Sequence, residues 1–374
     1  MSGAAPLRVL HLAANRWWTG SADPTIQLIA GLVARGHRAW LGVVPGDRFE
    51  AKAREARIEL VEGLDLDPRF APAGTLRDIR RLRRFIRAEA VDLVHTHHSH
   101  DHWLGWFVAS AGVSGRVPLV RTFHNRRSVK QGRAARWLYR RTATVFAVSH
   151  QIEARCRDAG IPPDRVVWTP GLADLSRFDA PADSASIREE FKLAAAPTVV
   201  SVARLAPNRG HELLLAGFRQ LLREIPDARL LLVGKGETRG GLEQLVVELG
   251  LTERVVFTGY RDRDLPAVLS AADCFALMAA GSDESCRAAL EAMAAGRAVV
   301  AGRHGALPDT VVDGETGFLV DEDRPESVAA ALAAVLAHPA RAAAMGRAGR
   351  RRAEEVFSPA RAVETVERVY RTLT

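Results

Sequence analysis

Short apolar segments alternate with helical patterns along the whole chain. In the first half, the runs that we interpret as buried parallel strands are Leu7–Leu12, Ala39–Val44, Val91–His95, Val117–Arg121, Thr144–Val148 and Val166–Trp168. Helical spacing of apolar residues separates these runs, as in Pro24–Arg35 and Arg77–Glu89. The alternation restarts after a polar, Ala- and Pro-rich interval, with apolar runs at Thr198–Val202, Arg229–Val233, Val255–Thr258, Cys274–Leu277 and Ala298–Val300. The pattern therefore predicts two successive α/β units, each a doubly wound parallel sheet.

The boundaries of these units follow from the same pattern. We predict a Rossmann-like domain over residues 1–172, a linker over 173–196 and a second Rossmann-like domain over 197–356. Residues 357–374 end in a helical pattern, Pro359–Leu373, that we expect to cross back to the first domain. Because ligands of such sheets bind beyond the carboxyl ends of the strands, we expect both domains to face a shared central cleft.

Length and composition agree with an intracellular protein of two domains. The chain has 374 residues, and no apolar run approaches the ~20 residues that a membrane-spanning helix needs. A strand-like segment begins at Leu7, which leaves little room for a signal peptide before it. The three cysteines show neither CxxC nor metal-ligand spacing. A reduced, cytoplasmic compartment is therefore expected.

Positive charge is concentrated in the first half of the chain. Residues 1–175 contain 27 Lys and Arg against 16 Asp and Glu, whereas the remainder contains 25 against 28. Arginines crowd the predicted helix at Arg77–Arg87, whose apolar positions Leu76, Ile79, Leu82, Phe85 and Ile86 share one face. The arginines either form a solvated face or lie on an anionic membrane surface. Nucleic-acid binding is not expected, because the chain has no zinc-finger, helix-turn-helix or RNA-binding signature.

Two acids flank a predicted helix start in the second half. Asp283 precedes a run of good helix formers that begins at Arg287, Ser285 is placed to cap that helix, and Glu291 lies inside it. Free N–H groups and the positive end of the helix dipole gather at such a start. Acceptors around an anion-attracting point suit a ligand with both hydroxyl and phosphate groups, such as a nucleotide-sugar.

Two arginines follow the first strand of the second unit. Arg204 and Arg209 lie between Val202 and a helix expected near Gly210, where guanidinium groups can bind a diphosphate in bidentate fashion. Glycines end the next two strands. Gly234, in a Gly-Lys-Gly turn, would let the backbone approach a ligand, although a purely structural turn is the simpler interpretation. Gly259 ends the following strand, where a nucleobase could meet main-chain groups.

In the first half, a loop and several histidines follow strand ends. Gly20 closes a loop before a predicted helix, whose N-terminus could bind an anion. A dense group of histidines, with members at 95, 97, 98, 100 and 102, allows either a zinc site or a polar cleft wall. No matching carboxylate or cysteine set favours the metal. His124 follows another strand end and should face the cleft.

Taken together, these segments resemble the family-4 glycosyltransferases, which are retaining enzymes of the GT-B fold. The likeness covers nearly the whole chain. It rests on the Arg-Leu-x-x-x-Arg-Gly-His-Glu run at Arg204–Glu212 and on the acid-x7-Glu-Ala-Met-Ala-x-Gly run at Asp283–Gly296. The runs Gly305–Asp309, Asp313–Val320 and Ala147–Ser149 give further support. The resemblance implies an acceptor-binding first domain and a donor-binding second domain.

The resemblance also implies roles for individual residues. Arg204 and Arg209 would neutralise the leaving diphosphate, Glu291 would accept hydrogen bonds from ribose hydroxyls, and Asp283 would hold the hydroxyls of the transferred sugar. The catalytic residues that we expect are His124, Arg204, Arg209 and Asp283. The donor-binding residues that we expect are Gly20, Arg204, Arg209, Gly234, Gly259, Asp283, Glu284, Ser285, Cys286 and Glu291. No metal ion or other cofactor would be needed, because cationic side chains and the helix dipole stabilise the leaving group.

Three positions depart from the family pattern. The first acid is Asp283 where the family usually has Glu, and the adjacent Glu284 has one residue too few before Glu291. Arg209 replaces the usual Lys, and Gly20-Ser21 replaces a Gly-Gly pair. These changes leave the identity of the donor open.

The sequence thus predicts a retaining, metal-independent glycosyltransferase. It would move a sugar from a nucleotide-diphosphate donor to a lipid, polysaccharide or other glycan acceptor of the cell envelope. The inner face of the cytoplasmic membrane is one location left open for this activity. Two alternatives remain open at this stage: a GT-B nucleotide-sugar epimerase, and a non-catalytic module that binds nucleotide-sugars or membranes.

Overall fold

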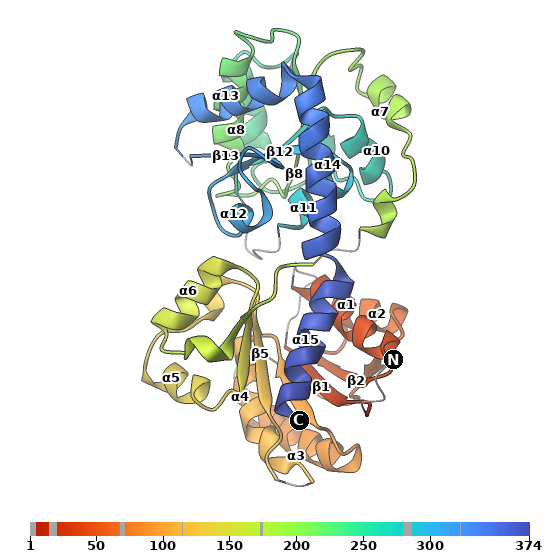
Figure 1. Ribbon diagram of the computed structural model, residues 1–374, viewed down its shortest axis with the longest axis vertical. Coiled ribbons are helices and arrows are strands. Elements are labelled where there is room, and N and C mark those ends of the chain that lie inside the picture. The colour runs from red at the N-terminus through yellow and green to blue at the C-terminus, as the bar shows by residue number, and fades with distance from the viewer. Residues whose placement is uncertain are drawn as a thin grey trace. The chain divides into compact units, whose positions relative to one another are not determined.

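The chain folds into two compact units (Figure 1). The first unit comprises Met1–Leu172 together with Pro359–Thr374, and the second comprises Ala173–Ser358. The structure is a computed structural model, which describes residues 5–14, 21–67, 72–113, 115–172, 175–279, 286–321 and 323–374. Gly20, Asp283, Glu284 and Ser285 therefore lie outside the described residues, and their expected roles stay predictions.

The first unit is built on a seven-stranded parallel sheet. Its strands are β1 (Arg8–Ala13), β2 (Arg38–Val43), β3 (Glu59–Leu60), β4 (Leu93–Thr96), β5 (Leu119–Phe123), β6 (Thr144–Ala147) and β7 (Val166–Trp168). Its helices are α1 (Ala22–Ala34), α2 (Arg48–Glu55), α3 (Pro72–Ala88), α4 (Ser99–Val108), α5 (Arg133–Tyr139), α6 (His150–Asp158) and α15 (Pro359–Leu373), with short 3₁₀ turns at Ala109–Ala111 (η1), Arg126–Ser128 (η2) and Pro163–Arg165 (η3). The strand order is β3-β2-β1-β4-β5-β6-β7, which reverses direction between β1 and β4.

Alternating side chains of this sheet enter cores on its two faces. Leu10 and Leu12 of β1 pack in one core with Leu82 and Ile86 of α3 and with residues of α4. Val9, on the opposite face of β1, packs in another core with residues of α1 and α15. The C-terminal helix is therefore an integral layer of the first unit. Its Val363 side chain fills the space beside Gly31 of α1, where an added Cβ would lie 2.4 Å away.

The second unit repeats the architecture with six parallel strands. These are β8 (Thr198–Val202), β9 (Arg229–Val233), β10 (Val255–Gly259), β11 (Cys274–Leu277), β12 (Ala298–Gly302) and β13 (Gly317–Val320). The helices are α7 (Ser184–Glu190), α8 (His211–Leu221), α9 (Arg239–Glu248), α10 (Leu265–Ser270), α11 (Arg287–Ala294), α12 (Leu307–Thr310), α13 (Pro325–Leu336) and α14 (Pro339–Val356), with a 3₁₀ turn, η4, at Ser176–Phe178. The order β10-β9-β8-β11-β12-β13 reverses between β8 and β11.

In the second unit, successive side chains of the strands also alternate between cores on the two faces of the sheet. Val199 and Leu230 enter a core formed with α8, α9 and α13, while Val200 and Leu231 enter the opposite core with α10, α11 and α14. Two doubly wound units were predicted, and the sheet topology confirms them.

Several local expectations need correction. The segment 173–196, expected to be a linker, contains α7, and its Ile187 is buried in the second core. Leu76, assigned to the apolar face of α3, is 46% exposed. Asp78, in contrast, is buried on α3, because its carboxylate accepts hydrogen bonds from the backbone N–H groups of Asp65 and Leu66.

The described part of the chain contains no single helix that is long and apolar enough to cross a membrane. One bent pair, Pro325–Leu336 with Pro339–Leu373, meets the requirement only when its helices are counted together.

Candidate active site

The reversal of strand order in each unit marks where a ligand site is expected. At such a point neighbouring connections leave to opposite faces of the sheet, which opens a crevice beyond the carboxyl ends of the strands. In the second unit this point lies between β8 and β11. Arg204 and Arg209 follow β8 directly, and α11, which carries Glu291, follows β11. The predicted phosphate and hydroxyl ligands therefore belong to the two connections at the switch point.

Arg204 is held by the connection that follows the neighbouring strand. Its Nη2 donates to Glu237 Oε2 at 3.0 Å, and both side chains are largely exposed. The backbones of the two connections are joined as well, because Leu205 N donates to Lys235 O and Thr238 N donates to Leu205 O. Leu205 itself is fully buried and anchors the loop. The backbone beside Arg204 is thus fixed by hydrogen bonds, whereas its guanidinium group is exposed to solvent, where an anion can reach it.

Glu237 is a functional candidate that the sequence analysis missed. A hydrogen bond from its own backbone N–H, a hydrogen bond from Arg204 and the charge of Arg209 lower the pKa of its carboxyl group. The acid is therefore ionised at neutral pH and neutralises part of the positive charge beside it. Its place directly after the Gly-Lys-Gly turn that ends β9 is the signal that could have identified it.

The glycines of that turn are required by close contact between backbones. Gly234 has φ +148°, and a Cβ there would lie 1.9 Å from the carbonyl oxygen of Ala203. A Cβ on Gly236 would lie 2.0 Å from the carbonyl oxygen of Leu205. This packing accounts for both residues without a ligand, which supports the structural interpretation of the turn. Gly259, with φ +75°, accepts a hydrogen bond from Gly234 N. Donor contacts of Gly234 and Gly259 remain predictions.

The residue after Arg209 lies against the end of β11. This residue is Gly210, which occupies the N-cap position of α8 with φ +71°. A Cβ on Gly210 would come within 2.5 Å of Cβ of Met278, the residue that follows β11. The start of α8 is therefore pressed against the connection that leads to α11. His211 Nε2 lies 3.2 Å from the carbonyl oxygen of Arg204, which ties the two ends of the arginine loop together.

Helix α11 positions Glu291 in a buried site. The side chain is 6% exposed, and its Oε1 lies 3.1 Å from Nε of Arg287, one helical turn earlier. Burying a carboxylate is unfavourable unless charge and hydrogen bonds compensate it, and Arg287 supplies that compensation. The expected cap was wrong in position: the N-cap residue is Cys286, which adopts φ +50° and is buried, and its side chain does not cap the helix.

In the first unit, the corresponding switch point is lined by histidines. His11 of β1 lies opposite His95 of β4 in the strand register. His97 follows β4 and lies within hydrogen-bond distance of two other rings: its Nε2 is 3.1 Å from His11 Nδ1, and its Nδ1 is 3.2 Å from His124 Nε2. The three rings form a buried chain that ends at His124. His11 was not predicted from the sequence, because it lies 86 positions before His97.

Hydrogen bonds determine the protonation of this chain. Burial lowers the pKa of all three histidines, so each ring is neutral and carries one proton. Thr25 Oγ1 uses its proton to donate to Ser21 O, and therefore accepts from His97 Nδ1 at 3.3 Å. His97 Nε2 is then an acceptor for His11 Nδ1–H, and His124 Nε2 accepts from His97. His124 consequently carries its proton on Nδ1.

The same hydrogen bonds bear on the metal alternative. His11, His95 and His97 have nitrogen atoms within 4.8 Å of one another. Both nitrogens of His95, however, already lie at 2.5 and 2.7 Å from the hydroxyls of Tyr370 and Thr122. Metal binding would have to break one of those bonds and the His11–His97 bond. The described geometry therefore favours a hydrogen-bonded wall over a metal site.

A buried ion pair supports the histidine chain. Asp101 Oδ2 accepts from His97 N, Oδ1 accepts from His98 N, and Arg121 Nη1 lies 3.9 Å from Asp101 Oδ1. Burial raises the pKa of Asp101 to about 6 despite the guanidinium and these hydrogen bonds. Burial likewise lowers the pKa of Arg121 to about 10. Asp101 positions the loop that carries His97, and Arg121 lies beside its carboxylate; neither was identified from the sequence.

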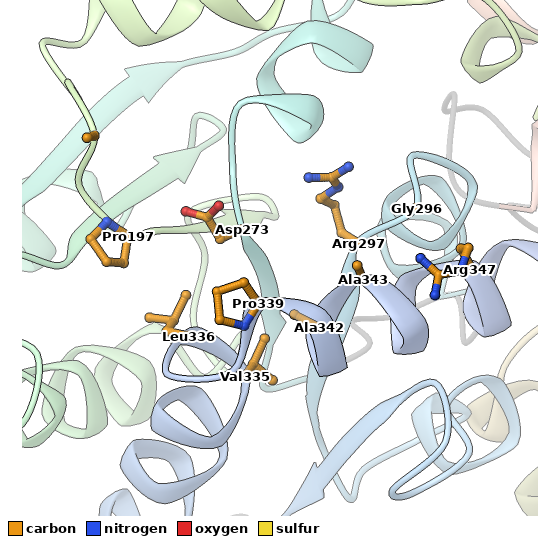
Figure 2. A pocket seen from close by; sticks show the side chains of 11 residues that line it. Pro197, Asp273, Gly296, Arg297, Val335, Leu336, Pro339, Ala342, Ala343 and Arg347 are labelled. Carbon is orange, nitrogen blue, oxygen red and sulfur yellow. The ribbon is translucent and has the colours of Figure 1, made fainter.

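A cavity of about 580 Å³ lies elsewhere, at the opposite edge of the second sheet (Figure 2). Pro197, Asp273 and Arg297 line it, and each immediately precedes a strand, so the cavity adjoins the amino ends of the strands. Two of its polar side chains bind backbone: Asp273 Oδ2 accepts from Thr198 N, and Arg297 Nη1 donates to Ala272 O. These contacts hold loops in place and do not point to the switch-point chemistry.

Comparison with solved structures defines the fold. A glycosyltransferase from Rickettsia africae has a TM-score of 0.86 at 18% identity, with 99% of each chain covered. The structure of HepE from Anabaena in complex with UDP has a TM-score of 0.84 at 21% identity, covering 98% of this chain and 100% of that one. The paired parallel sheets are therefore the GT-B fold of glycosyltransferases.

Sequence comparison defines the family. Residues 20–177 match the family model Glycosyltransferase Family 4, and residues 183–352 match Glycosyl transferases group 1. A GDP-mannose-dependent alpha-(1-6)-phosphatidylinositol monomannoside mannosyltransferase of Mycolicibacterium smegmatis is 37% identical over 273 residues, which are 67% of this chain and 72% of that protein. A D-inositol 3-phosphate glycosyltransferase of Segniliparus rotundus is 33% identical over 287 residues, 69% of this chain and 61% of that protein. The chain belongs to glycosyltransferase family 4 and is a glycosyltransferase.

Proposed function

We propose that this enzyme transfers a sugar, with retention of anomeric configuration, from a nucleoside-diphosphate-sugar to a lipid or glycan acceptor of the cell envelope. The observation that carries the proposal is the exposed Arg204 at the switch point, with Arg209 beside it and the start of α8 directly after them. Two guanidinium groups at this point suit a diphosphate leaving group. In this proposal the Glu291 carboxylate accepts hydrogen bonds from the ribose hydroxyls. Asp283, Ser285 and Cys286 bind the transferred sugar.

In this proposal the first unit binds the acceptor. His124 acts as a hydrogen-bond donor to the sugar through Nδ1–H, because its Nε2 faces His97. A neutral donor can stabilise a sugar hydroxyl without removing its proton. Positive charge from Arg204 and Arg209 would stabilise the negative charge on the leaving diphosphate, as a metal ion does in other transferases. The proposed reaction therefore needs no metal.

GDP-mannose is the donor to test first, because the mycobacterial relatives are named for it. UDP-sugars come second, because HepE has been solved with UDP. The experiment measures thermal stabilisation by each donor and then follows product with a phosphoinositide and with inositol phosphate as acceptors. A bound donor raises the unfolding temperature by mass action. Donor binding together with an α-linked product, assigned by NMR and formed in the presence of a chelator, supports the proposal. A product of inverted configuration, or C2 epimerisation of the donor without acceptor, contradicts it.

The diphosphate contact is tested by Arg204→Ala. Removing one charge-assisted contact to a developing charge should lower kcat/KM roughly a hundredfold, about 3 kcal/mol. Arg254→Ala is the matched control. Arg254 precedes β10 at the opposite edge of the sheet and pairs with Asp227 at 3.6 Å. Turnover of Arg204→Ala equal to that of the control would refute the assignment.

A further inference from the structure

A cluster of aromatic side chains lies exposed on the first unit. Trp103 and Phe107 of α4 and Trp137 of α5 are 38%, 45% and 37% exposed. Trp106 joins them, with its ring 4.7 Å from Trp137 and 4.9 Å from Phe107 between centroids, and Trp103 stacks on Trp137 at 6.1 Å. We call these four residues the aromatic face. Neighbouring Val113, in the loop after α4, is 69% exposed. Contiguous large apolar side chains of this kind mark an interaction surface.

Arginines border the aromatic face and are fixed on it. The guanidinium of Arg141 lies 3.9 Å from the Trp137 ring centroid and donates to Trp137 O. That of Arg116 lies 5.2 Å from the Trp106 ring and donates to Trp106 O at 2.7 Å. One face of each indole is therefore covered by a cation, so a sugar cannot stack on that face. The arrangement presents ring edges and positive charge together.

The sequence that follows Asp101 and carries the aromatic face contains no acidic residue up to Glu153. This segment contains nine Lys and Arg. Exposed cations on and around α5 include Lys130, Arg133, Arg136, Arg140 and Arg141. Helix α3, which packs beside α4 and the following turn (Figure 1), adds Arg83, whose Nη2 donates to Ser110 Oγ. An unbroken excess of cations around tryptophans complements a surface that is anionic outside and apolar beneath.

We propose that the aromatic face is the site at which this enzyme docks onto an anionic lipid bilayer. The tryptophans and Phe107 enter the interface between headgroups and acyl chains, and the bordering arginines bind lipid phosphates. This differs from the expectation that the arginines of α3 are the main contact, because α3 exposes cations but only Leu76 as a large apolar side chain. The inference goes beyond the proposed function, because hydrolysis of a donor in solution does not require the bilayer.

The first experiment is co-sedimentation with phosphatidylcholine vesicles with and without phosphatidylglycerol. The variant Trp103→Ser/Phe107→Ser/Trp137→Ser should bind anionic vesicles at least about tenfold more weakly than the unaltered protein. The matched control is Val33→Ser/Val247→Ser, which removes apolar side chains that are 46% and 65% exposed on α1 and α9. Equal losses in both variants, or no binding of the unaltered protein to anionic vesicles, would overturn the proposal.

A second experiment separates the two basic surfaces. Arg116→Glu/Arg141→Glu should weaken binding to anionic vesicles more than Arg80→Glu/Arg84→Glu on α3, with donor hydrolysis unchanged in both. A loss confined to the α3 variant would overturn the assignment to the aromatic face. The assignment would also be overturned if the unaltered protein were a dimer and the triple serine variant a monomer. The aromatic face would then bind a second copy of the chain.

A third measurement does not depend on disruptive substitutions. Brominated lipids quench tryptophans that enter the interface, so anionic brominated vesicles should quench part of the emission of the unaltered protein. The conservative variant Trp103→Phe/Trp106→Phe/Trp137→Phe should still bind vesicles, and most of that quenching should be lost. Undiminished quenching would place the contact elsewhere and refute the proposal, even if the serine variant failed to fold.

Discussion

Glu367 is predicted to hold the C-terminal helix on the first unit in a pH-dependent way. Its carboxylate pairs with Arg35 at the end of α1, lies 3.2 Å from His37 Nε2 and accepts from Arg371 Nη2 at 2.8 Å. Burial raises the pKa of this carboxyl group, but the contacts with Arg35, Arg371 and His37 outweigh it and lower the pKa from 4.5 to about 2. The ionised form is thus strongly favoured in the folded state.

The size of the effect follows from that pKa. At about 1.4 kcal/mol per pH unit, a fall from 4.5 to about 2 stabilises the folded state by roughly 3 kcal/mol once the carboxyl is ionised. Arg35 and Arg371 are 48% and 33% exposed, and solvent weakens their part, so we expect about 2 kcal/mol. Because the folded pKa is the lower one, this stability is complete above pH 4.5 and is lost as the pH falls toward about 2.

The assay is urea unfolding of Glu367→Gln, followed by circular dichroism across that pH range. The control is Glu364→Gln, because Glu364 lies on the same helix, is 58% exposed and pairs only across one turn with Arg361 among the contacts described for it. At neutral pH the Glu367 variant should lose about 2 kcal/mol and the control close to nothing. The difference in unfolding free energy between Glu367→Gln and the unaltered protein should vanish as the pH falls toward about 2. A loss that is the same at every pH would show that packing, and not the charge, is responsible.

Two further predictions concern the switch points. Glu237→Gln should tighten binding of a nucleoside diphosphate severalfold in calorimetry at low salt, because Arg204 no longer pairs with a competing acid; weaker binding would mean that Glu237 itself contacts the donor or orients Arg204. His97→Leu should lower kcat roughly tenfold with little change in affinity for the sugar donor, because His124 loses the hydrogen bond that positions it. His97→Asn keeps a hydrogen-bond donor toward His124 and should retain more activity. Equal kcat for the two His97 variants, or nitrogen NMR showing the His124 proton on Nε2, would refute the protonation derived for the chain.

Elements of the fold were predictable where burial dominates. Strands β8, β9 and β11 have the bounds predicted from their apolar runs, because both faces of a central parallel strand are covered. Of the edge strands that the structure describes, β3 and β13 were missed, whereas β7 and β10 were predicted. β3 is only Glu59–Leu60 and β13 is only Gly317–Val320, so neither leaves a long apolar run in the sequence. Helix α11 began one residue after Cys286, where a left-handed backbone takes the place of a capping side chain.

The histidine chain shows what a sequence cannot convey. Histidines at 95, 97, 98, 100 and 102 are visible as a cluster, yet the partners that define its chemistry are His11, Thr25 and His124. Those residues come together only when β1, β4 and β5 adopt their register. Spacing along the chain allowed a zinc site, whereas the fold directs the same nitrogens into hydrogen bonds.

The same limit applies to the charges of the donor site. Arg204 and Glu291 were predicted as independent ligands, but each already has an oppositely charged neighbour in the free protein: Glu237 for Arg204 and Arg287 for Glu291. A donor that binds Arg204 must therefore replace the carboxylate of Glu237. Its binding free energy at Arg204 is only the difference between the two interactions. A diphosphate carries more charge than a carboxylate and can bind both Arg204 and Arg209. The net preference for the donor should thus fall with added salt less steeply in the native protein than in Glu237→Gln. If the proposed donor site is correct, its specificity should depend on that competition as well as on the arginines themselves.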